Sequence, residues 1–310
     1  MAGPVSSSAI ADSVLRLAVL LQAGIAPARA WAYLAEAGDE PAVRVCAAVE
    51  RGMPLPAAIA SAGVPSIPQR RLRSRRAGHD SGQTRWSDVA AAWQVAAAVG
   101  APLAESLRAL SAALRDAQEA ADDVRVALAE PAATAKLMGW LPLVAVLLGV
   151  ALGFDTFGTL MGSPIGLACL VAGAALIVGA QRWNAALVGR ARAAGGIPGL
   201  DAEMLAIALS GGVSIGRARR LEHETAGATP DAATDAVLDL SRTAGVPAVE
   251  LLRATSTLAR HRARIDGRLR AARLATRLLL PLGVCTLPAF LLLGVAPMLL
   301  SVMTSVRLPL

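Results

Sequence analysis

One short stretch of the sequence matches a motif of serine hydrolases. The pentapeptide GVSIG at residues 212–216 fits G-x-S-x-G, in which a sharp strand-to-helix turn exposes a nucleophilic serine. No strand pattern precedes Ser214, and Glu222, His223 and Glu224 lack the spacing of a catalytic triad, so we expect them on a polar helix face. We interpret the match as accidental and predict that the chain is not an enzyme. Labelling of Ser214 by a fluorophosphonate probe would contradict this.

The residues that bind metals or phosphates in other proteins also lack the required spacing. Cys46, Cys169 and Cys285 are far apart in the sequence and form no C-x-x-C pair, so we expect three small buried hydrophobic residues. No G-x-x-x-x-G-K-[ST] phosphate loop is present. We therefore predict no metal site and no cofactor, and any nucleotide-driven work would need an ATPase on another chain.

The composition favours helices and a membrane. Of the 310 residues, 55% are hydrophobic but only 3% are aromatic, which disfavours β-sheet. Three stretches carry no charged residue and are long enough to cross a bilayer: Leu137–Phe154, Thr156–Gln181 and Leu278–Val306. The sequence predicts an all-α membrane protein with a transmembrane hairpin at 137–181 and a C-terminal transmembrane helix at 278–303. Spans without ionisable residues argue against an ion-coupled transporter.

The basic residues predict how these spans are oriented. All 30 Lys and Arg residues except Arg307 lie in residues 1–136 and 182–277. Because positive charge accumulates on the cytoplasmic side, both blocks are predicted to be cytoplasmic helical-bundle domains, with the N-terminus inside and the C-terminus outside. Nucleic acid is not an expected partner, since the basic residues are not interleaved with aromatic ones.

The two basic blocks repeat one another. GAPLAESLRALSAALR at 100–115 matches GVPAVELLRATSTLAR at 245–260, with an offset of 145 residues. LAVLLQAGIAPARA at 17–30 matches LAIALSGGVSIGRA at 205–218, with an offset of 188. The first block thus holds 43 additional residues, among them an arginine-rich insert at about 65–87. Each block reads as a small helical domain whose last helix runs into a hydrophobic span.

Glycine ends several of the predicted helices. A glycine directly after a helix takes the left-handed conformation that closes it, and proline is tolerated in the first turn of the next helix. We expect this role for four glycines: Gly24, Gly100, Gly212 and Gly245. Pro102 and Pro247 are expected in the first turn of the long helices.

Charged residues that recur in both blocks are the candidate partner contacts. Glu105 and Arg108, and likewise Glu250 and Arg253, stand three positions apart on one helix face. The alternative is a surface ion pair within each helix, worth about 0.2–0.5 kcal/mol. The run Arg70–Arg76 fits anionic lipid headgroups or an acidic partner, and equally a solvated loop.

The repeated domain, attached to a membrane span, resembles the F domain of type II secretion and type IV pilus platform proteins. The first block with its span is similar to a TadB-type domain of the Tad/Flp pilus branch. The second block resembles the TadC ending, especially in Pro281-Leu282, Cys285, Leu287-Pro288-Ala289-Phe290 and Pro297. The likeness covers about Leu15 to Met303.

This resemblance implies a non-enzymatic platform in the bacterial cytoplasmic (inner) membrane. Such a protein couples a cytoplasmic secretion ATPase to the extraction of pilin or pseudopilin subunits, and it associates with itself or with a paralogous platform subunit. Glu105, Arg108, Glu250 and Arg253 would then contact the ATPase. The alternative is a membrane scaffold or permease subunit of an unrelated ATP-driven complex.

Overall fold

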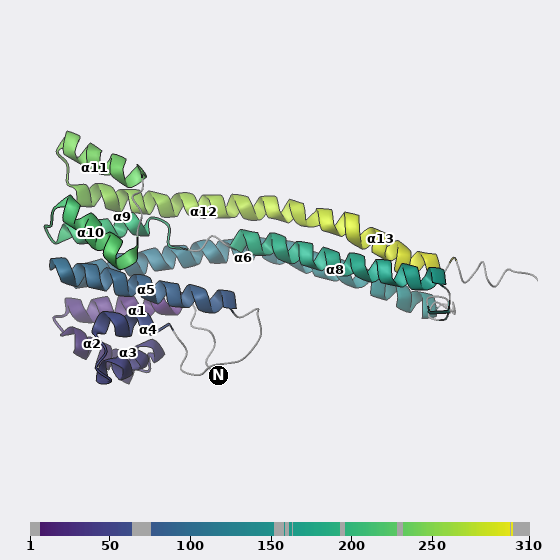
Figure 1. Ribbon diagram of the computed structural model, residues 1–310, viewed down its shortest axis with the longest axis horizontal. Helices are drawn as coiled ribbons and strands as arrows, with labels where there is room; N and C mark the ends of the chain where they lie inside the picture. The colour runs from purple at the N-terminus through teal and green to yellow at the C-terminus, as the bar shows by residue number, and fades with distance from the viewer. Residues whose placement is uncertain are drawn as a thin grey trace, which may run out of the picture. The chain divides into compact units, whose positions relative to one another are not determined.

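The computed structural model describes residues 7–63, 76–151, 164–192, 196–227 and 232–297, with single positions at 158, 161, 162 and 299. All regular secondary structure in these residues is helical, as predicted (Figure 1). The chain divides into two compact units. One comprises residues 1–120 and 195–265, and the other comprises residues 121–194 and 266–310. The predicted borders at 136 and 277 fall inside two continuous helices, α6 (Leu103–Ala151) and α12 (Ala248–Pro281).

The first unit contains the helices of both repeats. The first repeat provides α1 (Ser7–Gln22), α2 (Pro27–Glu36), α3 (Glu40–Glu50), α4 (Leu55–Ser61), α5 (Arg76–Val99) and the beginning of α6. The second provides α9 (Leu200–Ser210), α10 (Ile215–Ala226), α11 (Ala232–Ala244) and the beginning of α12. The matched sequences therefore occupy α1 and α9, the starts of α2 and α10, and the starts of α6 and α12. Helices α3 and α4 belong to the additional residues of the first repeat.

The four predicted turn glycines all have left-handed backbones. Their φ values are +83° at Gly24, +69° at Gly100, +77° at Gly212 and +68° at Gly245, and each follows the last turn of a helix. This conformation strains any residue that has a Cβ. The prolines lie slightly earlier than expected, because α6 begins at Leu103 and α12 at Ala248. Pro102 and Pro247 thus precede the first helical residue instead of lying in the first turn.

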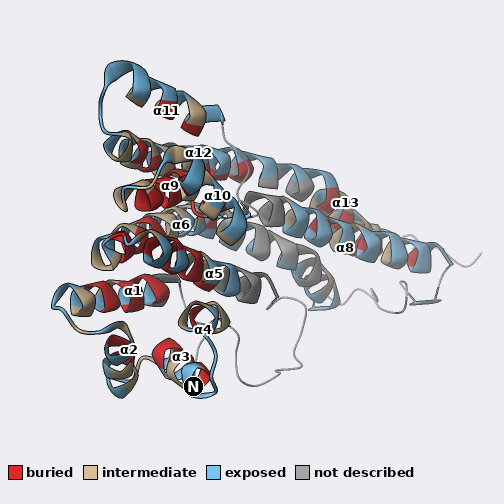
Figure 2. Cartoon of the chain, turned by 60° about the vertical axis from the view of Figure 1, so that its left-hand side comes forward, coloured by how far each residue is buried: buried red, intermediate tan, exposed pale blue. Residues whose placement is uncertain are grey.

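Helix α5 lies at the centre of the first unit. It packs against α1 and α4 of its own repeat and against α9 and α10 of the second repeat. Trp86 of α5 is fully buried, and its ring lies 6.3 Å from that of Trp31 in α2. Residues 76–87, predicted as the end of the arginine-rich insert, are therefore the first half of a core helix. Figure 2 shows buried residues along α1, α5 and α9, whereas α11 is exposed over most of its length.

The second unit contains α8 (Pro164–Arg192) and the C-terminal helical segments. Two π-helical turns, η2 (Leu282–Thr286) and η3 (Leu291–Val295), flank α13 (Leu287–Phe290), and all three pack against α8. Each π turn ends two residues before a proline, Pro288 or Pro297, because a wider turn avoids the clash between the proline ring and the preceding carbonyl. At Gly173 a Cβ would lie 2.5 Å from Cγ of Leu293, so α8 and η3 are in close contact there.

One helix in the described part of the chain is long and apolar enough to cross a membrane. It covers Pro164–Leu187, with a mean hydropathy of 1.9, and only 17% of its most apolar window is buried. The first predicted span lies in α6 up to Ala151, and its last residues fall outside the described ones. The third predicted span begins with the end of α12, η2, α13 and η3, where the apolar helix Gly283–Val295 is shorter, and most of its residues after 297 fall outside the described ones.

Candidate functional site: the charged seam between the repeats

The structure brings together three of the four predicted contact residues. Nη2 of Arg253 lies 2.7 Å from Oε1 of Glu105, so the second repeat pairs with the first. The pair within the helix, Arg253 with Glu250, is longer at 3.9 Å. Arg108 lies apart from this group and donates to the side chain of Gln22 in α1. The recurrent motif therefore serves in part to join the repeats, which neither sequence interpretation anticipated.

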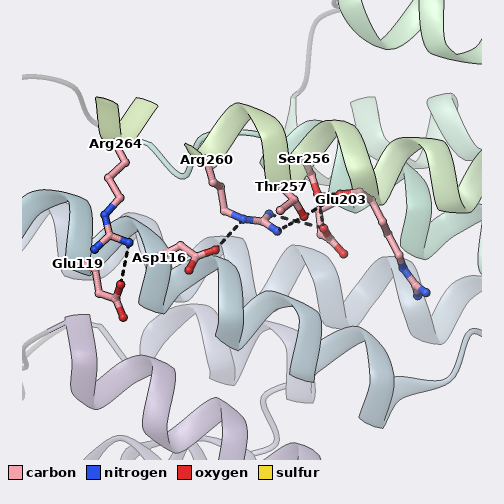
Figure 3. A network of polar contacts seen from close by, with 8 residues as sticks. Asp116, Glu119, Glu203, Ser256, Thr257, Arg260 and Arg264 are labelled. Atoms are coloured by element: carbon pink, nitrogen blue, oxygen red, sulfur yellow. Dashed lines mark hydrogen bonds and ion pairs between the residues drawn. The ribbon is translucent and has the colours of Figure 1, made fainter. Parts of the chain in front are cut away.

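Two further ion pairs join the same helices (Figure 3). Nε of Arg260 lies 3.0 Å from Asp116, and Nη1 of Arg264 lies 3.0 Å from Glu119. We call the six residues of these three pairs the charged seam: Glu105, Asp116 and Glu119 on α6, and Arg253, Arg260 and Arg264 on α12. The residue numbers rise together along both helices, so the helices are parallel. Arg264 is offset from Glu119 by 145 residues, which is the offset of the sequence repeat.

The centre of the seam is buried and includes an acidic residue of α9. Glu203 is 2% exposed and Ser256 is 0% exposed. The Ser256 hydroxyl donates to Oε2 of Glu203 at 2.7 Å, and Nη1 of Arg260 lies 3.7 Å from the same oxygen. Arg260 also donates to Oγ1 of Thr257 at 3.1 Å. Because a buried carboxylate is costly without a charged partner, this network fixes α9, α12 and α6 against one another.

The loop before α9 packs tightly on this network. Gly199 has φ of +74°, and a Cβ there would lie 2.7 Å from the carbonyl oxygen of Ser256. Only glycine fits this position, both for its backbone conformation and for space. The loop therefore determines how closely Glu203 approaches α12.

The second unit contains an equivalent pair on the same two helices. Arg268 contacts Oδ2 of Asp123 through Nη2 at 3.0 Å and Nε at 3.2 Å. Leu128, Ala271 and Leu274 are buried nearby in a small cluster. Asp123 and Arg268 are 145 positions apart, like Glu119 and Arg264, so α6 and α12 keep the same parallel register in this unit.

A second group of acidic residues lies where α5 meets α9 and α10. Burial raises the pKa of Glu222 to about 7, with Asp201 adding to the rise and Arg219 opposing it. Burial also raises the pKa of Asp88 to about 6, where Arg85 opposes and Asp201 adds to the effect. The predicted placement of Glu222 on a polar helix face is therefore wrong, since only 8% of this residue is exposed.

The remaining sequence candidates do not assemble into a reactive site. Ser214 is exposed at the N-terminus of α10, and the helix α9 precedes it where a nucleophile elbow needs a strand. Among the described residues, no group of three or more His, Cys, Asp or Glu side chains is arranged to hold a metal ion. Burial and Glu50 raise the pKa of the Cys46 thiol, which disfavours the reactive thiolate. The side chains of the run Arg70–Arg76 lie outside the described residues.

These features describe a helical chain in which α6 pairs with α12 and one long apolar helix is poorly buried. Residues 14–151, from within α1 to the end of α6, match the family model of type II secretion system (T2SS), protein F. The match supports an F-type domain over these residues. No curated protein and no solved structure matched the chain.

Sequence reasoning missed the seam because a repeat does not reveal which surfaces of its copies meet. A signal was nevertheless present. The acids Asp116, Glu119 and Asp123 lie on one face of α6, and Arg260, Arg264 and Arg268 lie on one face of α12 at an offset of 144 or 145 residues. Complementary charges at the repeat offset are what a parallel pair of helices requires.

Proposed function

We propose that the chain is an inner-membrane platform protein of a Tad/Flp-type pilus or type II secretion machine, and that it is not an enzyme. The observation that carries this proposal is the match of residues 14–151 to protein F of type II secretion. The family is associated with the inner membrane and with secretion or pilus assembly. The poorly buried apolar helix Pro164–Leu187 agrees with a membrane location, because a helix of this length and composition is normally covered by protein or lipid.

In this proposal the long helices transmit force from a cytoplasmic ATPase to the membrane. Helix α6 is continuous from Leu103 to Ala151, and α12 is continuous from Ala248 to Pro281. Three ion pairs connect them in the first unit, and a buried carboxylate anchors α9 to them. A push on the beginning of either helix would thus move both helices together. Pilin or pseudopilin subunits would be extracted beside the membrane segments.

The proposed topology places both repeats in the cytoplasm, with three spans and the C-terminus outside. It rests on the distribution of arginine and on the apolar stretches, of which the first forms the end of α6 and the third begins at the end of α12. The partners in this proposal are the secretion ATPase, pilin-like subunits, the bilayer, and a further copy of the chain or a paralogue.

Photo-crosslinking in cells tests the proposed ATPase contact. Glu250 is the better of the two recurrent acids, because its side chain is 73% exposed, while replacing Glu105 would break its 2.7 Å pair with Arg253. A photoreactive residue at Glu250 should capture a secretion ATPase, identified by mass spectrometry. The same residue at Val43, exposed on α3, is the control and should not capture it. Capture of another transporter's ATPase, or of none at normal expression, would contradict the proposal.

A further inference from the structure

Within one chain the two repeats meet through a contact that is not reciprocal. Helix α5 of the first repeat packs against α9 of the second. A Cβ on Gly211, after α9, would lie 2.5 Å from Cγ2 of Val99 at the end of α5. At the other end of the contact, Asp201 in the first turn of α9 is close enough to influence the Asp88 carboxyl of α5. The helices therefore run parallel, with 88 beside 201 and 99 beside 211.

The residues between these two ends form one stripe on each helix. Counted back by helical spacing from the contact of Val99 with Gly211, the stripe is Ala92, Val95 and Val99 on α5, and Met204 and Ile207 on α9 with Gly211 directly after it. Such spacings of three or four residues stay on one side of a helix. The stripes are well covered, since Val95 and Ile207 are each only 1% exposed.

The sequence repeat supplies a second copy of both stripes. At the offset of 145, the counterparts of the α5 stripe are Val237, Leu240 and Ala244 on α11. At the offset of 188, the counterparts of the α9 stripe are Arg16, Val19 and Ala23 on α1. We call these the α11 stripe and the α1 stripe.

Both counterpart stripes are exposed in the chain except at Val237, which packs against the hydrophobic core. Leu240 is 53% exposed where Val95 is buried, and Val19 is 52% exposed where Ile207 is buried. Arg16, Ala23 and Ala244 are also exposed, and Val237 is half-buried. If a two-fold axis related the repeats, α11 would cover α1 of the same chain as α5 covers α9. The exposed stripes show that the contact is head-to-tail, which leaves one half of an interface open at each end.

The counterpart residues suit a similar contact. The α11 stripe is wholly apolar, and in the α1 stripe the aliphatic stem of Arg16 can cover apolar surface while its guanidinium remains in water. The tight contact of Val99 with Gly211 is replaced by Ala244 with Ala23, so a smaller residue on α11 faces a larger one on α1. The smaller side chain of Ala244, compared with Val99, leaves part of the space that the methyl group of Ala23 needs.

We propose that a second copy of this chain docks its α1 stripe onto the α11 stripe, repeating between chains the contact that α5 and α9 make within one chain. The occupant is another copy, because the chain itself carries the α1 stripe, the counterpart of the surface that α5 covers. The charged seam fits this arrangement. Its pairs join residues that are 144, 145 and 148 positions apart, at or near the repeat offset of 145, so neighbouring repeats are little displaced along the helix axis. Successive chains would therefore stand in one plane, as proteins sharing a membrane must.

Cysteine crosslinking between two tagged copies tests the direction of the contact. The full chain, with Cys46, Cys169 and Cys285 replaced by alanine, receives Val19→Cys in one copy and Leu240→Cys in the other. After oxidation in native membranes, we expect a disulfide-linked dimer when the copies are co-expressed and none from either variant alone. The double variant should give a ladder of larger products. Leu258→Cys on α12, where the leucine is 46% exposed against 53% for Leu240, replaces Leu240→Cys in the control, which should give no dimer with Val19→Cys.

Each alternative result overturns the proposal. A dimer of Leu240→Cys with itself would indicate a two-fold interface, and a disulfide within one chain of the double variant would indicate that α11 closes on its own α1. No crosslink, despite both thiols reacting with a maleimide, would show that the stripes do not meet. A second variant, Leu240→Arg, should convert the oligomer to a single chain in native mass spectrometry, whereas Leu258→Arg should not. These results are independent of whether an ATPase binds.

Discussion

The buried centre of the seam predicts that its two neighbouring arginines differ greatly in their contribution to stability. Arg260→Ala would leave the Glu203 carboxylate buried, with Ser256 as its hydrogen-bond donor but without a cation. Breaking a buried ion pair costs about 3–5 kcal/mol. The 3.7 Å separation from Glu203 and the remaining hydrogen bond from Ser256 reduce this figure, so we expect about 2–4 kcal/mol.

Arg264→Ala is the matched control on the same helix. Arg264 and Glu119 have the same 3.0 Å separation as Arg260 and Asp116. The side chains of Arg264 and Glu119 are 35% and 50% exposed, however, whereas that of Arg260 is 10% exposed. A solvent-exposed pair is worth about 0–1 kcal/mol. Burial, and not the number of ion pairs, should therefore decide the difference between the two variants.

Thermal unfolding of the purified chain in detergent, followed by helical circular dichroism, measures this difference. For a unit of the size formed by residues 1–120 and 195–265, each kcal/mol shifts Tm by about 2–4 °C, so Arg260→Ala should lower Tm by about 5–15 °C. Glu203→Gln in the Arg260→Ala background should recover part of the loss, because the amide needs no cation. Equal Tm values for Arg260→Ala and Arg264→Ala, or no recovery by Glu203→Gln, would refute the reasoning.

Two further predictions concern the contacts around α9 and α10. Because the pKa of Glu222 is raised to about 7, the folded chain holds a proton that the unfolded chain releases near pH 4.5, so stability falls as pH rises from about 4.5 to 7. Glu222→Gln should therefore stabilise the chain at pH 8 by up to about 3 kcal/mol and by much less at pH 5. The control Glu224→Gln, at an exposed position, should change stability little. Equal gains in stability at both pH values would contradict this prediction. Gly199→Ala should destabilise by about 2 kcal/mol, through strain at positive φ and overlap with α12. The control Gly216→Ala, in a helix with open space around it, should be neutral or stabilising in the same denaturant titration.

The local structure was largely predictable from sequence, because it depends on neighbouring residues. Alanine-rich and leucine-rich stretches gave helices, and glycines at the ends of apolar periods gave left-handed turns at Gly24, Gly100, Gly212 and Gly245. Periodicity failed where tertiary burial decided the outcome. The sequence from 76 to 87 is polar and arginine-containing, yet it begins α5 because Trp86 packs into the core beside Trp31.

The contacts between repeats were not predictable, because they join residues that are more than 100 positions apart, from 112 for Val99 with Gly211 to 148 for Glu105 with Arg253. A contact within the second repeat was equally hidden, since the partners of Glu203 lie 53 and 57 positions further along the chain. An acidic residue in the first turn of a helix is normally explained by the helix dipole, yet this one is buried and paired with Ser256 and Arg260. Its counterpart at the offset of 188 is Leu15, so comparison of the two repeats could have marked this position as specific to the second.

The two kinds of contact have different consequences for assembly. Charge complementarity distinguishes the repeats, since acids line α6 and arginines line α12, and two copies of α6 placed together would repel one another. The seam therefore favours pairing of the first repeat with the second within a chain. The α11 stripe is apolar and the α1 stripe carries one charge, at Arg16, so these stripes discriminate less between partners, but a head-to-tail contact needs only shape and apolar area to extend from chain to chain. In this proposal the charged seam holds the two repeats of one chain in register, and the α11 and α1 stripes add further copies in one plane. The loss of Leu240 should thus abolish assembly and leave the seam intact, while the loss of Arg260 should destabilise every copy alike.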